Sequence, residues 1–164
     1  MFKPEGIMPA LVTPFTYDQK AVDEEKLRFL VNHSIEQGVS GVLACGTTGE
    51  FTSLTTEERK RVIRTVLDEA NGKVPTIAGT GASSTQQTLE LTKFTKDAGV
   101  QAALIVAPYY VKLSERSLYE HFSKTAMVRV SWGLLSFSAT TLGSWDRSSM
   151  SCGVSGLPVH WGIL

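Results

Sequence analysis

Short β-branched runs alternate with amphipathic helical patterns along the first 126 residues, and this alternation constrains the fold more than any other feature of the chain. Alternating strands and helices form βα units that share a parallel sheet. The runs lie at residues 7–12, 39–45, 74–78 and 101–107. The last run is almost wholly apolar, as a strand covered on both faces should be. The sequence therefore predicts an α/β fold with four βα units.

The ends of the predicted helices are marked by residues that satisfy free backbone groups. A residue with a capping side chain precedes each helix, namely Asp23, Thr55, Ser84 and Ser114. Glu58 and Gln87 follow the second and third caps by three residues, which is the pattern of a capping box. The first three helices are expected to end at Gly38, Asn71-Gly72 and Gly99, and the fourth at about Ala126.

The repeat stops after residue 126. Residues 127–164 contain eight serines and all three tryptophans, but only three charged residues. No helical or alternating period is found there. We therefore divide the chain into residues 1–126, which form the βα units, and a serine-, glycine- and tryptophan-rich tail over residues 127–164. The tail is interpreted as a linker, a specialised segment or sequence from another reading of the gene.

Composition favours a small-molecule substrate. Sixteen basic and sixteen acidic residues cancel, so no positive field attracts nucleic acid or an anionic membrane surface. No apolar run approaches the length of a membrane span, and Pro4 and Glu5 argue against a signal peptide. A cytosolic location is expected. Cys45 and Cys152 form neither a disulfide framework nor a zinc site, and Cys45 is expected to be a buried, inert thiol.

Loops that follow parallel strands open on one face, where active sites lie. The loop of residues 46–50 places the hydroxyls of Thr47 and Thr48 between two glycines, a geometry suited to a carboxylate or phosphate oxygen. A tight turn with threonine caps is the alternative interpretation. The loop lacks the Gly-Lys-Ser/Thr ending of a P-loop, and residues 79–84 depart from a dinucleotide-binding fingerprint at Ser84.

Tyr109 and Tyr110 follow the fourth predicted strand, where phenols relay protons or simply pack. Both interpretations stay open on the residues alone. The three histidines have no partner at metal-ligand spacing, so no metal site is predicted.

Taken in order, these loops resemble the dihydrodipicolinate synthase/N-acetylneuraminate lyase family. The matching motifs are Pro9-Ala10-Leu11-Val12-Thr13-Pro14-Phe15, Gly46-Thr47-Thr48-Gly49-Glu50, Ala78-Gly79-Thr80-Gly81, and Ala107-Pro108-Tyr109-Tyr110 followed by Leu118-Tyr119-Glu120-His121-Phe122. The resemblance covers residues 1 to about 126. It implies the N-terminal half of a (β/α)8 TIM barrel.

Family members are class I aldolases, in which a lysine amine condenses with the keto group of pyruvate and the derived enamine attacks or releases an aldehyde. The resemblance implies that Thr47 and Thr48 hold the pyruvate carboxylate and that Thr47 passes a proton to Tyr110. It also implies a homo-oligomer with Tyr109 and Tyr110 at the interface, where Tyr110 reaches the neighbouring site. No metal or organic cofactor is implied.

Two family features are missing from the sequence. The family has a tyrosine at the end of strand five and the Schiff-base lysine at the end of strand six, and neither motif occurs here. No lysine follows Lys124, and Lys112 lies in the loop after the fourth predicted strand, which is the wrong element for the nucleophile. The chain by itself is therefore expected to lack aldolase activity.

Three functions stay open. The synthase branch of the family (4-hydroxy-tetrahydrodipicolinate synthase, a lysine-biosynthetic lyase) is preferred. However, Val111-Lys112-Leu113 after the tyrosine pair is more similar to the keto-acid sugar aldolases, of the 2-keto-3-deoxygluconate aldolase or N-acetylneuraminate lyase type. The third function, of another class, is a non-catalytic truncated fragment or interaction module.

Overall fold

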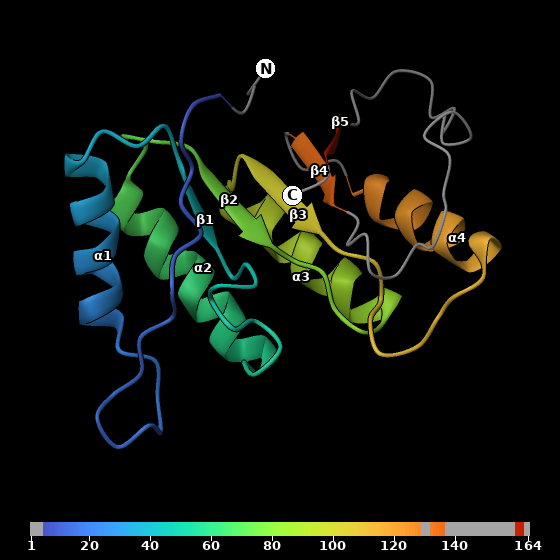
Figure 1. Ribbon diagram of the computed structural model, residues 1–164, viewed down its shortest axis with the longest axis horizontal. Helices are drawn as coiled ribbons and strands as arrows, with labels where there is room; N and C mark the ends of the chain where they lie inside the picture. The colour runs from blue at the N-terminus through green and yellow to red at the C-terminus, as the bar shows by residue number, and fades with distance from the viewer. Residues whose placement is uncertain (1–4, 129–131, 137–159, 163–164) are drawn as a thin grey trace.

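A computed structural model describes residues 5–128, 132–136 and 160–162 of the chain. Its sheet is entirely parallel, and its strands follow the order of the sequence (Figure 1). The strands are β1 (Val42–Ala44), β2 (Thr76–Gly79), β3 (Ala102–Ile105), β4 (Trp132–Ser136) and β5 (His160–Gly162). Because all strands run the same way, their carboxyl ends meet at one edge of the sheet.

In the described part of the chain one helix precedes β1 and one helix lies between each two successive strands from β1 to β4. The four helices pack side by side, each on the next (Figure 1). They are α1 (Glu24–Glu36), α2 (Thr56–Ala70), α3 (Thr85–Ala98) and α4 (Glu115–Ala126). Helix α2 contacts β1 and β2, and α3 contacts β3. The alternation of helices and strands predicted for residues 1–126 is therefore confirmed from α1 onward.

The four predicted caps are all present. The side chain of each capping residue accepts a hydrogen bond from a backbone N–H in the first turn, and the residues are Asp23, Thr55, Ser84 and Ser114. At Thr55 the full capping box forms, because Glu58 also bonds back to the Thr55 N–H. The second expected box is only half formed. The side chain of Gln87 donates instead to Thr56 Oγ1, 2.9 Å away, and so ties α3 to the start of α2.

The first predicted strand, at residues 7–12, is an extended segment with a single bridge from Ala10 to Leu43. It still lies along β1, since Leu11 N donates to Leu43 O and Leu43 N donates to Pro9 O. Pro9 has no N–H to give to a ladder, which explains why regular pairing does not develop. The prediction of a full strand is wrong in detail.

The tail also differs from expectation. Its composition predicts no regular element, yet β4 pairs with β3 from Ala102 to Ile105, and β5 pairs with β4. The segments are three to five residues long, so pairing with the neighbouring strand specifies them more than any pattern of their own. The division of the chain at residue 126 stays a prediction.

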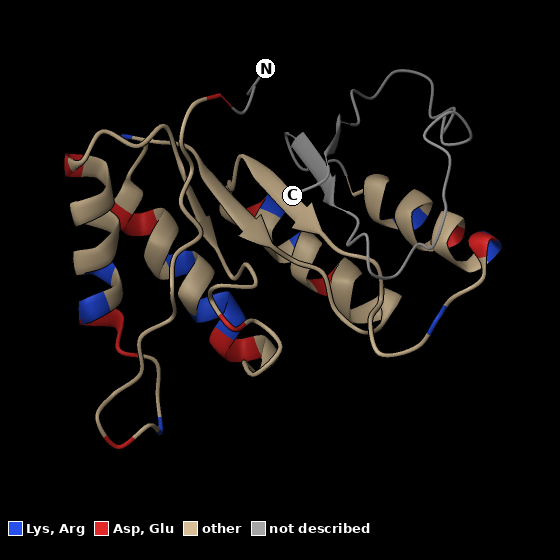
Figure 2. Ribbon diagram, in the orientation of Figure 1, with Lys and Arg blue, Asp and Glu red and all other residues tan. Residues whose placement is uncertain are grey.

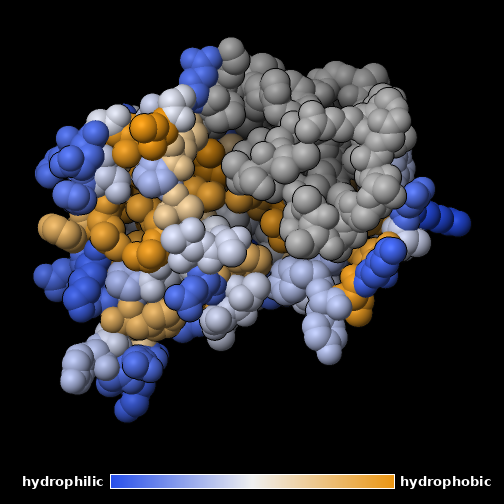
Figure 3. All heavy atoms as spheres, in the orientation of Figure 1, coloured by the Kyte–Doolittle hydropathy of each residue, from blue (hydrophilic) through white to orange (hydrophobic). Residues whose placement is uncertain are grey.

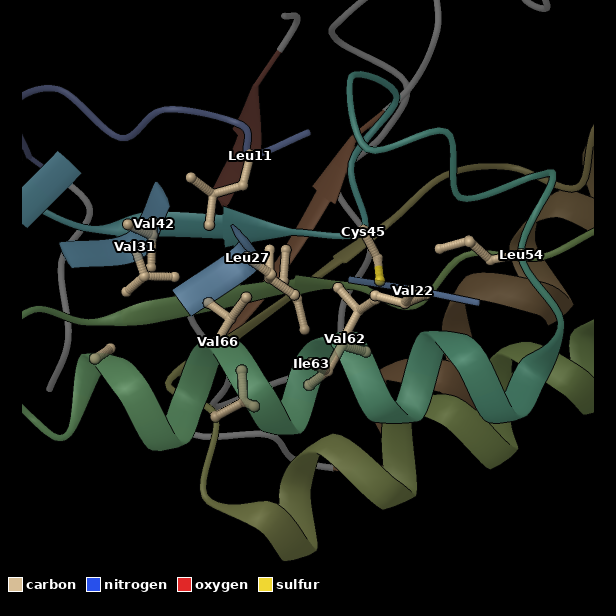
Figure 4. Packing of buried hydrophobic residues seen from close by; sticks show 14 residues of the cluster. Leu11, Val22, Leu27, Val31, Val42, Cys45, Leu54, Val62, Ile63 and Val66 are labelled. Atoms are coloured by element: carbon tan, nitrogen blue, oxygen red, sulfur yellow. The ribbon is translucent and has the colours of Figure 1, made fainter. Parts of the chain in front are cut away.

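The main core lies between α1, α2 and β1 (Figure 4). Leu27 and Val31 of α1 meet Ile63 and Val66 of α2, and all four side chains are fully buried. Burying an aliphatic side chain of this size stabilises the fold by about 1.5–3 kcal/mol. A smaller cluster joins β3 to α4 through Phe122, so apolar burial ties the helical layer to the sheet along its length.

Charged and apolar residues are separated in space. No Lys, Arg, Asp or Glu occurs in β1, β2 or β3, and the charges of these units lie on helices and loops (Figure 2). In the space-filling view, apolar residues gather over the strands and hydrophilic residues surround them (Figure 3). Among the described residues no helix is both long and apolar enough to cross a membrane.

Candidate active site

Three loops follow the carboxyl ends of β1, β2 and β3. We call residues 45–53, 79–84 and 106–112 together the strand-end rim. Every site residue predicted from the sequence lies in this rim, namely Thr47, Thr48, Tyr109 and Tyr110.

Thr47 and Thr48 lie in a tight turn after β1 and are both exposed. The turn closes through bonds from Gly49 N to Gly46 O and from Glu50 N to Thr47 O, each 3.0 Å. Neither the hydroxyls nor the backbone N–H groups of Thr47 and Thr48 form a hydrogen bond within the described residues. Four hydrogen-bond donors on one turn thus lack a partner among the described residues. Clustered donors of this kind suit the binding of an oxyanion.

The turn is held rigidly against the N-terminal segment. Thr13 Oγ1 donates to Gly49 O at 2.8 Å. A Cβ on Gly49 would lie 2.9 Å from the Leu11 carbonyl oxygen, so a side chain does not fit there. Residues of the Pro9–Phe15 motif therefore pack against the turn and support its conformation.

Close backbone contacts bring the three loops of the rim together. A Cβ at Gly79 would clash with the carbonyl oxygen of Cys45, and one at Gly81 would lie 2.7 Å from Val106 N. Glycine at these positions lets the end of β2 lie against the ends of both neighbouring strands. Thr80, between them, is fully buried and accepts a hydrogen bond from Thr92 of α3.

The two tyrosines after β3 have different environments. Tyr109 is half-buried, and its ring meets Phe51 of the β1 loop edge to face, with centroids 5.8 Å apart. Tyr110 is fully exposed and has a φ of +81°, in a region that a bulky residue rarely adopts. Its phenol makes no hydrogen bond within the described residues, and none joins it to Thr47.

Arg59 is a residue of this region that the sequence analysis missed. It belongs to α2 and is 2% exposed, with Nη2 donating to Gly79 O at 2.8 Å. Burial lowers the pKa of its guanidinium from the ordinary value, while Cys45 and Tyr109 nearby raise it. Arg59 precedes Val62 by three residues and Ile63 by four, so its place on the inward face of α2 was a detectable signal.

Cys45 is a poor nucleophile in this setting. Its side chain is buried, and burial raises the pKa of the thiol to about 11. The thiolate form is therefore scarce at neutral pH. The expectation of a buried, inert thiol is confirmed.

The histidines lie away from the rim turn. His33 is exposed and stacks on Phe29, with ring centroids 6.0 Å apart. His121 is buried between α4 and α3, with Nδ1 2.9 Å from Thr85 Oγ1. Burial lowers the pKa of His121. In the part of the chain that the structure describes, no cluster of His, Cys, Asp or Glu is placed to hold a metal.

The chemistry available in the rim is therefore binding and proton transfer. Among the described residues, the hydroxyls and N–H groups that lack a partner are suited to hydrogen-bond a small anion, and an exposed phenol is suited to proton exchange. An imine-forming amine is not part of this arrangement, since Lys112 is the rim's lysine and its side chain is exposed in the loop after β3.

Comparison with known proteins identifies the group to which this arrangement belongs. The model of the dihydrodipicolinate synthetase family matches residues 3–131. The 4-hydroxy-tetrahydrodipicolinate synthase of Methanopyrus kandleri is 51% identical over 125 residues, which are 76% of this chain and 42% of that protein.

Solved structures agree with the sequence match. The chloride-inhibited dihydrodipicolinate synthase of Acinetobacter baumannii, complexed with pyruvate, is 44% identical with a TM-score of 0.76, over 80% of this chain and 45% of that chain. N-acetylneuraminate lyase from Mycoplasma synoviae is 29% identical with a TM-score of 0.77, over 84% and 47% of the two chains. The parallel sheet and its helices are thus part of a TIM barrel.

The chain spans about two fifths of the length of the curated relatives it matches. Within that span it has the turn at Thr47 and Thr48, the glycine contacts and the tyrosine pair in one rim. The family match extends over most of the 164 residues, and it agrees with the fold of solved members. The chain belongs to the dihydrodipicolinate synthetase family.

Proposed function

We propose that residues 1–126 supply the pyruvate-binding and proton-transfer part of a Schiff-base lyase of the 4-hydroxy-tetrahydrodipicolinate synthase type. The observation that carries the proposal is the turn at Thr47 and Thr48, whose hydroxyls and N–H groups have no partner within the described residues. Such a turn at the carboxyl ends of parallel strands binds carboxylates.

The two threonines have complementary roles in this proposal. Thr48 and the backbone N–H groups donate hydrogen bonds to the pyruvate carboxylate, which orients the keto group. Thr47 shares in that binding and also exchanges a proton with the Tyr110 of a second copy as the imine forms and breaks down. Because these donors are fixed before substrate arrives, binding requires little reorganisation.

The amine must come from residues beyond the rim. Carbinolamine and imine formation require a primary amine, and neither a threonine hydroxyl nor a phenol replaces it. No lysine follows Lys124 in this chain. We therefore propose that residues 1–164 alone carry out no aldol chemistry, and that a family-like second half restores it.

The aldehyde partner defines the branch. The curated relatives that the chain matches at 46–51% identity are 4-hydroxy-tetrahydrodipicolinate synthases, which favours the synthase and a role in lysine biosynthesis. Val111-Lys112-Leu113 supports the keto-acid sugar aldolases as second candidates. A non-catalytic chain is the candidate of another class, supported by the absence of the lysine.

Subunit association is also part of the proposal. Tyr110 is fully exposed and Val111 is 54% exposed, so an apolar group stands out from the rim. We propose that this group contacts a second copy in the assembled enzyme and that Tyr110 enters the neighbouring site. A cytosolic location stays a prediction.

A chimera tests the proposed function. Residues 1–126 are joined to the second part of the Methanopyrus kandleri synthase, and condensation of pyruvate with an aldehyde is measured. We expect activity, and Thr47→Val should lower kcat on the order of 10²-fold, as for loss of a proton-relay group. Thr52→Val is the control, because Thr52 is an exposed threonine of the same loop. Equal rates for both variants would remove Thr47 from the mechanism.

A further inference from the structure

Arg59 is buried in a manner that stability alone does not favour. Its side chain is 2% exposed on the inward face of α2, and no carboxylate lies within ion-pair distance among the described residues. Its Nε has no hydrogen-bond partner there either. Long charged side chains are rarely buried without an acidic partner, since removing them from water costs several kcal/mol.

Arg59 links two loops of the rim. Its Nη2 donates to Gly79 O at the end of β2, 2.8 Å away. Its guanidinium also lies over the ring of Phe51, 5.1 Å from the centroid, in the loop after β1. One side chain thus contacts both loops, which are far apart in sequence.

Phe51 extends the link to the third loop. Its ring packs edge to face on Tyr109, which immediately precedes the exposed and strained Tyr110. A bulky residue at positive φ costs about 1–3 kcal/mol and persists only when its surroundings hold it there. Within the described residues no hydrogen bond or ring contact holds the exposed Tyr110 side chain, whereas the ring of Tyr109, the preceding residue, is packed on Phe51.

We propose that Arg59 is a positioning residue that acts through Phe51 and Tyr109 to hold Tyr110 in its outward, positive-φ conformation. The value of this conformation to catalysis rests on the function proposed above. The geometric claim does not, because it concerns the conformation of one loop and can be measured without substrate.

Helix α2 contains a matched control. Arg64 lies over the ring of Phe94 at 5.4 Å, a contact of the same kind, but Arg64 is exposed and both residues lie outside the rim. Arg64→Met therefore removes a comparable arginine–aromatic contact from the same helix without touching the three loops.

NMR of the full 164-residue chain tests the geometric claim. In the unaltered chain we expect a strong intraresidue amide–Hα cross-peak at Tyr110, which is characteristic of positive φ. Arg59→Met should weaken that cross-peak and move the ring resonances of Tyr109 toward those of an unpacked tyrosine. Arg64→Met should move the signals of Phe94 and leave both tyrosines unchanged. Tyrosine signals that stay unchanged in a folded Arg59→Met variant would overturn the proposal.

Phe51→Leu decides the question if Arg59→Met does not fold. This variant keeps the bond from Arg59 to Gly79 O and removes the ring between Arg59 and Tyr109. The same changes at Tyr109 and Tyr110 are expected. A Phe51→Leu spectrum in which Tyr110 keeps its positive φ would show that the link does not hold it.

Kinetics of the chimera separate the two proposals. Arg59→Met should lower kcat by about tenfold with an unchanged KM for pyruvate, because the carboxylate turn is intact and only the tyrosine is misplaced. A higher KM with unchanged kcat would contradict positioning of Tyr110. An unaltered chimera without activity would instead count against the proposed function, and the NMR result would still stand.

Discussion

Helix α2 and the turn at Thr47 and Thr48 are less than ten residues apart, yet they differ in burial and in hydrogen bonding. Ile63 of α2 is completely buried among apolar side chains. Both threonines are exposed, and their donors have no partner among the residues that the structure describes. The helical layer is packed around a core of buried apolar side chains. The strand-end rim contains exposed donors and residues at positive φ, which do not stabilise the fold.

Backbone conformation shows the same contrast. Five non-glycine residues of the described chain have positive φ, and three of them lie in the rim, namely Cys45, Glu50 and Tyr110. The other two are in a surface loop and at the C-cap of α2. Strained residues are typical of preformed functional sites. The helical layer therefore contributes mainly to stability, and the rim is where we propose the function.

The largest effect is expected in the helical layer. Ile63→Ala removes a fully buried side chain and should lower the free energy of unfolding by about 4 kcal/mol. Asp68→Ala, on the exposed side of the same helix, should change it by less than about 0.5 kcal/mol. Urea titrations followed by circular dichroism measure both. Similar losses for the two variants would show that α2 is not packed as described.

A slightly smaller loss is expected where the rim meets the sheet. Gly79→Ala places a methyl group on the Cys45 carbonyl and should cost about 3 kcal/mol, at the upper end for overpacking. Gly72→Ala has open space around its Cβ and should cost only about 1 kcal/mol from its positive φ. If Gly79→Ala proved no worse than Gly72→Ala, the close approach of β1 and β2 would be wrong.

The parts of the fold that could be predicted from sequence are those that depend on neighbours in the chain. Asp23, Thr55, Ser84 and Ser114 cap their helices because a cap needs only a backbone N–H two or three residues away. The tight turn at residues 46–50 is local in the same sense. These features need no knowledge of tertiary contacts.

The features that could not be predicted depend on residues far apart in the chain. Whether Arg59 reaches Gly79 O depends on how α2 lies against β2. In our proposal the φ of Tyr110 depends on contacts among three loops, and β4 is recognised by its pairing with β3. The side chain of Gln87 does not complete the expected capping box, because it donates a hydrogen bond to Thr56 of another helix.

A smaller effect of opposite sign is expected for Tyr110→Gly. Glycine adopts positive φ without strain, so this variant should be stabilised by up to about 1 kcal/mol. Tyr17 is an equally exposed tyrosine that lacks positive φ, and Tyr17→Gly should be destabilised by about 0.5–1 kcal/mol. Thermal unfolding of the two variants side by side checks the signs. A destabilised Tyr110→Gly would remove the argument that the rim stores strain.

The last effect concerns pH and lies in the helical layer. Burial lowers the pKa of His121, so below about pH 6.5 the unfolded chain binds a proton that the folded chain resists. Stability should be constant above pH 7.5 and fall as the pH drops below 6.5, by at most about 1.4 kcal/mol per pH unit. His121→Gln should flatten this slope between pH 8 and 5.5. An unaltered slope in His121→Gln would assign the effect to other groups.

The central claim is that this chain provides the pyruvate-binding part of the site while the amine lies elsewhere. Borohydride reduction in the presence of pyruvate, followed by intact mass measurement, tests it most directly, because reduction fixes any imine on a lysine. We predict no adduct on the 164-residue chain, one adduct per chain on the chimera, and a strongly reduced yield when the chimera has Thr47→Val and Thr48→Val. An adduct on the 164-residue chain itself, or an undiminished yield in the double variant, would contradict the account.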